Sequence, residues 1–177
     1  MLTKTFNQAI RAAVTGESFT LKRVDGSVVT VTIPATVSNS YSQYFTQGML
    51  RIPALMKQDR YSSQVSIAGS GGVCFGTGTA EPTEDDYTIT QKVMNAGSGM
   101  SVTCGVAQNG NTWTGTYTII NSGTADVTIS EVGLYGTIMY SSNSYYCYLI
   151  DRTLLEEPIT IPANGGVGQI VYTVNIP

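Results

Sequence analysis

Four acidic side chains lie close together in one short stretch of the sequence, TAEPTEDDYT: Glu81, Glu84, Asp85 and Asp86. Carboxylates bind Ca²⁺ together with loop carbonyls, so Glu84, Asp85 and Asp86 are candidate metal ligands, although their spacing does not match an EF-hand loop. Two carboxylates could also serve glycoside hydrolysis, but such a pair must flank a cleft at a defined separation, which neighbouring positions in one loop do not provide. Because acids in a turn are typical of a solvated loop, we expect no metal and no cofactor.

The other residue types that carry chemistry are scarce. The sequence contains no histidine, which excludes Ser-His-Asp and Cys-His arrangements and removes the commonest general base and neutral metal ligand. Cys74, Cys104 and Cys147 are odd in number, show no CxxC spacing and lie among strand-like apolar residues. They therefore indicate buried free thiols in a reducing compartment rather than a disulfide framework or a zinc site. We expect a protein that is not an enzyme.

The composition limits the partners. Only 12% of the 177 residues are charged and the formal net charge is -3, so Ser, Thr, Asn, Gln and Gly must supply most of the polar surface. Such a surface suits other protein subunits or sugars, whereas nucleic acid needs clustered Lys and Arg. The N-terminal sequence lacks the apolar run of a signal peptide, and no stretch approaches the length of a membrane helix, so we expect no membrane insertion.

The N-terminal residues predict a helix followed by a hairpin. Phe6, Ile10 and Val14 are at helical spacing. Two strand-like runs then flank Asp25-Gly26, a pair that permits the positive φ angles of a tight turn. We interpret residues 1–33 as an element that attaches the chain to an assembly, with Phe6, Ile10 and Val14 as candidate attachment residues. Residues 34–63 show neither period and are interpreted as a connecting segment.

Residues 64–177 consist almost entirely of short strands and turns. Asn109-Gly110 marks a second hairpin, and Asn164-Gly165-Gly166 marks a turn before the last strand. Turn signals about every ten residues, without a helix long enough for a parallel crossover, predict an antiparallel β-sandwich of jelly-roll or immunoglobulin-like type. The predicted fold is therefore mainly β, with a short N-terminal helix and a β-hairpin.

Aromatic residues form two groups in the predicted strands. One contains Trp113, and the other surrounds the YSSNS turn with Tyr140, Tyr145, Tyr146 and Tyr148. An exposed aromatic platform could stack on sugars, while the alternative is ordinary strand packing or a protein interface. Both interpretations remain open at this point.

Two adjacent charges interrupt a late strand, SYYCYLIDRTLL. Arg152 falls within this run, and Glu131 precedes VGLY in the strand before it. Because a buried Arg needs carboxylate or carbonyl partners, we predict that Glu131 and Arg152 form a structural brace across the sheet or the sandwich edge. Asp151 alternates to the opposite face, where we expect it to be solvated or at an interface.

Three blocks of the sequence resemble a group of tailed-bacteriophage virion proteins in which the same blocks occur in the same order. They are FGTGTAEPTEDDYTIT, YTIINSGTADVTISEVGLYG and LIDRTLLEEPITIPANGGVGQIVYTVNI, and the resemblance covers approximately residues 72–177. It implies a β-sandwich and a structural role in a phage particle, in a tail, neck, head fibre or capsid decoration. These motifs carry no chemistry.

The leading hypothesis is therefore a non-enzymatic structural component of a virion, assembled in the host cytoplasm, whose partners are other virion proteins and further copies of itself. The alternative is a glycan-binding module, such as one for attachment to the bacterial surface. Low charge, Ser- and Thr-rich strands and unpaired thiols agree with the first hypothesis.

Overall fold

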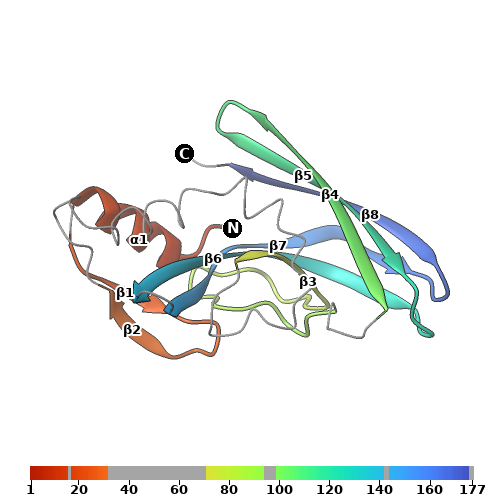
Figure 1. Cartoon of the computed structure of the whole chain (residues 1–177), viewed down its shortest axis with the longest axis horizontal. Coiled ribbons are helices and arrows are strands. Elements are labelled where there is room, and N and C mark those ends of the chain that lie inside the picture. The colour runs from red at the N-terminus through yellow and green to blue at the C-terminus, as the bar shows by residue number, and fades with distance from the viewer. Residues whose placement is uncertain (16, 32–70, 94–98, 142–143, 176–177) are drawn as a thin grey trace.

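The computed structural model describes residues 1–15, 17–31, 71–93, 99–141 and 144–175, and this part of the chain is mainly β (Figure 1). It begins with a helix, α1 (Lys4–Thr15), and a hairpin of β1 (Phe19–Lys22) and β2 (Val28–Val31). Six longer or more central strands follow: β3 (Gly72–Gly76), β4 (Met100–Asn109), β5 (Thr112–Asn121), β6 (Val127–Ser141), β7 (Ser144–Ile161) and β8 (Gly166–Asn175). The predicted fold class, including the helix and the hairpin, is confirmed. The predicted connecting segment 34–63 lies outside the described residues.

The strands after the hairpin form two antiparallel three-stranded sheets. One has the order β3-β6-β7 and the other the order β4-β5-β8. In Figure 1 the long strands β6 and β7 cross the middle of the molecule, and β4, β5 and β8 run over them at an angle. Phe75 of the first sheet packs edge-on against Tyr117 of the second, with ring centroids 5.5 Å apart. This arrangement is consistent with a β-sandwich.

The hairpin turns follow the predicted chemistry. β1 and β2 pair across Asp25-Gly26, and β4 and β5 pair across Asn109-Gly110. The φ angles of Gly26 and Gly110 are 81° and 58°, a region that glycine adopts without steric cost. Asn164 also has a positive φ, 58°, in the turn that leads into β8. These turns are fixed by local sequence.

One hydrophobic core joins both sheets, the helix and the hairpin. Val102, Tyr117, Ile119, Ile170, Tyr172 and Val174 come from the β4-β5-β8 sheet, and Val73, Phe75, Val132, Leu134, Tyr148 and Ile150 are among those from the β3-β6-β7 sheet. Phe6, Ala9 and Ala12 of α1 and Phe19, Leu21 and Val31 of the hairpin belong to the same cluster. The N-terminal segment therefore contributes to the core rather than standing apart from it.

α1 begins where the chain leaves the edge of the sheet. The Thr3 backbone N–H donates to the Ile150 carbonyl at 2.9 Å, and its hydroxyl donates to the Leu149 carbonyl at 2.6 Å. The same hydroxyl accepts from the Phe6 N–H at 3.3 Å, as a helix N-cap does. Thr3 is fully buried. This one residue thus fixes the start of the helix to β7.

Two local features depart from the regular strands that the sequence predicts over residues 64–177. Residues 87–93 run irregularly and contact β3 through an isolated bridge between Gly76 and Lys92. β6 continues through Gly133, and its pairing with β7 is irregular beside it. The irregularity lies in the partner strand, because Leu134 pairs with Asp151 and Tyr135 pairs with Leu149. Ile150 is therefore an extra residue, which defines a β-bulge.

Candidate functional site

The bulge in β7 determines on which face of the sheet the side chains of Asp151 and Arg152 lie. Ile150 belongs to the core between the sheets, and the Asp151 carboxylate contacts Tyr172 of the opposite sheet. Arg152 pairs with Gly133 and points to the other face, where the segment 77–93 covers the sheet. Asp151 and Arg152 therefore belong to two separate polar clusters, one on each face of β7.

Arg152 is the centre of the outer cluster. Its Nε donates to Oε2 of Glu131 at 2.6 Å, one terminal nitrogen donates to Oδ2 of Asp86 at 2.8 Å, and the other to the carbonyl of Ala80 at 3.0 Å. The Arg152 side chain is only 6% exposed. The contact that was predicted between Glu131 and Arg152 is present, and the guanidinium reaches two further groups from the 77–93 segment.

Glu131 completes the cluster from β6. It is fully buried, and its Oε1 accepts the backbone N–H groups of Gly78 at 2.9 Å and Thr90 at 2.6 Å, while Oε2 accepts from Arg152. A buried carboxylate normally needs such compensation, because the loss of water around a charge is costly. Here the two ends of the 77–93 segment supply the amide donors. We call Asp86, Glu131 and Arg152, with these backbone groups, the clamp.

The charges of the clamp stabilise one another. Burial by itself would lower the pKa of Arg152, but the hydrogen bonds and charges of Asp86 and Glu131 outweigh burial and raise it. Burial would raise the pKa of Asp86, and the hydrogen bonds from Arg152 and Thr83 lower it below its ordinary value. Thr83 contributes both its N–H, at 3.0 Å, and its hydroxyl, at 2.9 Å. Asp86 and Arg152 are therefore charged at neutral pH, and the hydrogen bonds of the clamp hold the 77–93 segment against β6 and β7.

Glycines make room for the buried carboxylate. A Cβ atom at Gly76 would lie 2.7 Å from Oε1 of Glu131, and a Cβ atom at Gly78 would lie 2.6 Å from its Cδ. Both separations are shorter than real side-chain contacts allow. The glycines of FGTGT therefore allow the backbone of this segment to approach the Glu131 carboxylate closely. Sequence analysis identified Glu131 and Arg152 but missed Asp86 as their partner, and these glycines were the available signal.

Asp151 occupies the inner cluster. The prediction that it is solvated or at an interface is wrong, because it is 6% exposed within the chain's own core. One carboxylate oxygen lies 2.8 Å from the Met1 amino group, and the other accepts the hydroxyls of Tyr172 at 2.6 Å and Thr153 at 2.9 Å. Desolvation and the charge of Asp151 raise the pKa of Tyr172. Asp151 thereby connects β7, β8 and the first residue.

The acidic candidates do not converge. Asp86 is engaged by Arg152, while Glu81, Glu84 and Asp85 are exposed on the surface. Asp85 instead lies 3.8 Å from Lys4 at the start of α1. Within the described residues, no group of three or more acidic or cysteine side chains is arranged to hold a metal ion. The candidate metal ligands Glu84, Asp85 and Asp86 and the glycosidase pair are therefore not brought together in the geometry that either function needs.

The three aromatic candidates whose side chains the structure describes, Trp113, Tyr146 and Tyr148, do not form one platform. Tyr148 is fully buried, and Tyr146 is partly buried with Arg23 5.3 Å from its ring. Trp113 belongs to β5 in the other sheet and packs against the core. The side chains of Tyr140 and Tyr145 lie outside the described residues. Tyr146 and Tyr148 therefore contribute to packing rather than to an exposed sugar-stacking surface.

Two of the three candidate attachment residues, Phe6 and Ile10, pack toward the core. Phe6 is 2% exposed, Ile10 packs partly buried against the same core, and the side chain of Val14 lies outside the described residues. The apolar side chains of α1 and the hairpin are part of that core, so deleting residues 1–33 would remove core side chains. An attachment surface in this region would have to use the outer faces of α1 and the hairpin.

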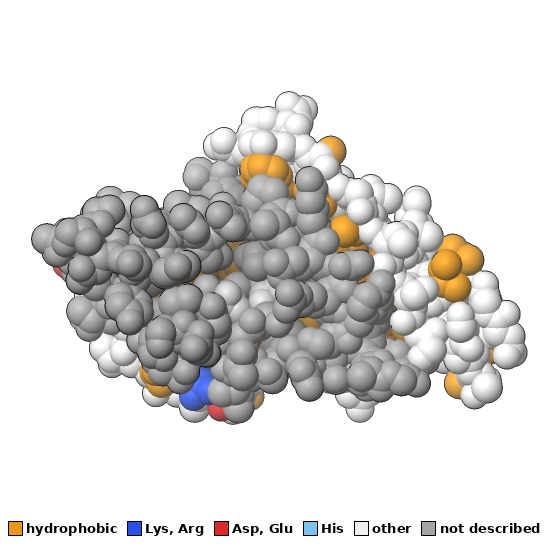
Figure 2. Space-filling model, in the orientation of Figure 1, with side chains coloured by type: hydrophobic (Ala, Val, Ile, Leu, Met, Phe, Trp, Pro, Cys, Tyr) orange, Lys and Arg blue, Asp and Glu red, His pale blue; other side chains and the backbone are white. Residues whose placement is uncertain are grey.

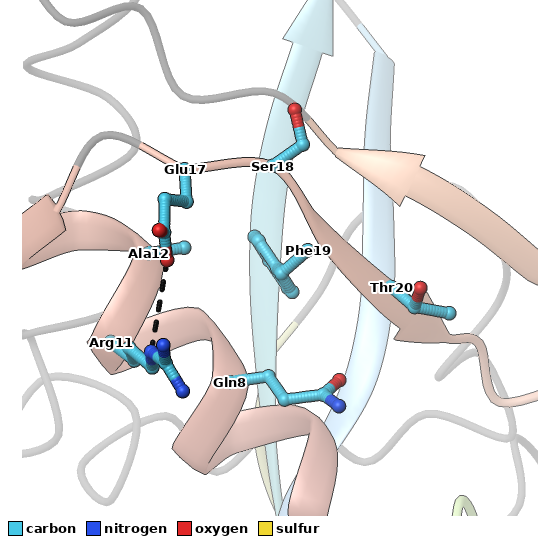
Figure 3. Close-up of a pocket in the computed structure, with 7 residues that line it drawn as sticks. All are labelled: Gln8, Arg11, Ala12, Glu17, Ser18, Phe19 and Thr20. Carbon is cyan, nitrogen blue, oxygen red and sulfur yellow. Dashed lines mark ion pairs between the residues drawn. The ribbon is translucent and has the colours of Figure 1, made fainter.

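A shallow hollow lies between α1 and β1 (Figure 3). It has a volume of about 240 Å³ and is lined by Gln8, Arg11, Ala12, Glu17, Ser18, Phe19 and Thr20. Arg11 Nε and Glu17 Oε2 are 3.7 Å apart at its rim, and both side chains are more than half exposed. No motif in the sequence indicates this hollow. Its charged groups pair with each other in solvent, so it has none of the buried, aligned groups that catalysis requires.

No helix in the described part of the chain is long and apolar enough to cross a membrane. Comparison with known proteins gives no further guide to the site, because no family model, no curated protein and no solved structure matches this chain.

Proposed function

We propose that this protein is a non-enzymatic structural component of a bacteriophage virion, located in a tail, neck, head fibre or capsid decoration, and that it acts through protein–protein assembly. The observation that carries the proposal is the clamp. Its groups come from all three sequence blocks that resemble phage virion proteins: Asp86 from the first block, Glu131 from the second and Arg152 from the third.

The clamp explains why these blocks occur together in one fold. Each block supplies a charged side chain to one cluster, and each charged side chain is used to hold backbone or another charge. A general base or nucleophile needs a group that is accessible to substrate and not fully committed to structure. The blocks therefore support a specific, rigid fold and give no reason to infer a reaction.

The surface of the second sheet supports assembly as the mode of action. β4, β5 and β8 contain no charged residue, and their solvent-facing positions carry mainly Thr, Ser, Gly, Asn and Val. Surfaces of this composition can approach another protein without desolvating charges, which is a major cost of binding. Other virion proteins and further copies of this chain are the proposed partners. No observation among the described residues favours the glycan-binding alternative, since Tyr148 is buried and Tyr146 is partly buried.

The test is the location of the protein in purified particles. Phage particles purified by density gradient from cells that express the chain from its phage genome should contain it, as measured by quantitative mass spectrometry, in several copies per particle. An epitope tag in the turn between β1 and β2, where Asp25 and Ser27 are exposed, should be visible on the particles by immunogold labelling. Abundant protein in the lysate but none in the particles would refute the proposal.

A further inference from the structure

The chain's own residues pair with part of each edge of the β3-β6-β7 sheet. At the β7 edge, Leu2 bridges to Asp151, and the Thr3 N–H donates to the Ile150 carbonyl. At the β3 edge, Gly76 bridges to Lys92, and the Val93 N–H donates to the Phe75 carbonyl at 3.0 Å. Covering an edge in this way prevents its unpaired N–H and C=O groups from pairing with another chain.

The outer edge of β8 is different. β8 is the last strand of the order β4-β5-β8, and no strand in the described part of the chain pairs with its other side. It pairs with β5 over ten consecutive residues without a register shift, so its outer edge is long and regular. Within Gly166–Asn175 there is no Lys, Pro, acidic residue or bulge, the features that usually protect an edge from pairing.

β8 also carries exposed apolar side chains. Val167 and Val171 are 60% and 61% exposed, whereas Ile170, Tyr172 and Val174 between and beyond them are buried. In Figure 2 the region occupied by β4, β5 and β8 shows white and orange atoms but no blue or red ones. The nine basic and twelve acidic residues of the chain all lie outside these three strands. β8 is therefore electrically neutral and exposes two valine side chains on the outer face of its sheet.

We propose that β8 is a self-association edge and that its occupant is β8 of a second copy of this chain, paired antiparallel about a two-fold axis. In a two-fold interface, the same surface patch of each copy faces its counterpart, so a charged edge would face an edge of the same charge. A neutral edge meets none, and for this reason the charge distribution fits a second copy. The result is a continuous sheet of six strands, with Val171 near the axis because it lies at the middle of β8.

This inference does not rest on the virion proposal. It concerns one edge and one partner, so a monomeric protein would overturn it without affecting incorporation into particles. Conversely, a dimer through β8 could form in a protein of any location.

The first experiment measures mass by light scattering after size exclusion. At roughly 100 µM, within the range where exposed strand edges associate, the protein should have twice its monomer mass of 18.8 kDa. Val171→Lys should weaken the dimer about tenfold or more, because two ammonium groups then face each other across the axis. Val28→Lys is the matched control: Val28 is 60% exposed on β2, away from β8, so this variant should remain dimeric. Circular dichroism checks that both variants fold.

The second experiment measures amide hydrogen exchange as a function of protein concentration. Dilution should increase exchange of β8 amides and leave β3 amides unchanged, because only β8 loses hydrogen bonds when the copies separate. A monomeric wild-type protein, a dimer that persists in Val171→Lys, or a dimer whose dilution leaves β8 exchange unchanged would each overturn the proposal.

Discussion

Replacing Arg152 by alanine tests the clamp directly. The substitution leaves the Glu131 carboxylate, which is 0% exposed, without its cation, although the N–H groups of Gly78 and Thr90 still donate to it. It also removes the partner of Asp86 and a donor to the Ala80 carbonyl. Breaking a buried ion pair costs about 3–5 kcal/mol. Because two amide donors remain, we expect the lower end, about 3 kcal/mol.

A loss of this size is large compared with the roughly 5–15 kcal/mol that stabilises an ordinary domain. For a chain of this length it corresponds to a decrease of about 6–12 °C in Tm. Urea unfolding followed by circular dichroism measures the free energy, and differential scanning calorimetry measures Tm. Arg11→Ala is the control, because Arg11 is 77% exposed and its pair with Glu17 is separated by 3.7 Å, so the expected change is under about 1 kcal/mol.

Two results would contradict this reasoning. The first is an Arg152→Ala variant whose free energy of unfolding lies within about 1 kcal/mol of the wild-type value. The second is a double variant, Glu131→Gln with Arg152→Met, that is less stable than Arg152→Ala alone. Removing both charges should relieve the stranded carboxylate, so the double variant is expected to recover part of the loss.

Three further predictions concern the surroundings of the clamp. Gly78→Ala should destabilise the protein by about 1–3 kcal/mol in urea unfolding, because its Cβ would overlap the Glu131 carboxylate, whereas Gly105→Ala, with open space around it, should change stability little. The pKa of Asp86 is lower in the folded protein, so its stabilisation is present above the unfolded pKa of about 4 and is lost as pH falls through the folded value. Asp86→Asn should therefore flatten the decline of stability in acid, and an unchanged acid unfolding curve would argue against this contribution. Burial raises the pKa of Cys74 to about 11 and that of Cys147 to about 12. Both thiols should therefore resist iodoacetamide at pH 8 in the folded protein and react in urea. Rapid labelling of either thiol in the folded protein would contradict the burial.

Local sequence predicted the elements whose geometry is set within a few residues. The hairpin turns at Gly26 and Gly110 follow from pairs that tolerate positive φ, and α1 follows from apolar spacing over 12 residues. The contact between Glu131 and Arg152 could also be predicted. An Arg in a strand of apolar residues needs a buried acceptor, and the preceding strand contains one carboxylate.

Predictions failed where a residue's surroundings come from distant parts of the chain. Strict alternation would have left Asp151 on a solvated face, but the bulge at Ile150 places it in the core, where the Tyr172 hydroxyl donates to its carboxylate. Phe6 was predicted to face a partner, yet the core shared by both sheets covers it. Local sequence does not indicate the bulge at Ile150, and it does not indicate that the core covers Phe6.

The sequence by itself thus determined the β class, the turns, the low charge and the absence of histidine, since these depend on residue type and short spacing. Only the tertiary structure decided that the glycine-rich loop is held by Glu131 and Arg152, and that β8 keeps an outer edge with no partner strand in the described part of the chain. The physical reason is that a buried charge or a strand edge acquires its role from groups far away along the chain, such as Asp86 and Arg152, which are 66 positions apart. Their meeting is a consequence of packing two sheets, a helix and a hairpin around one core.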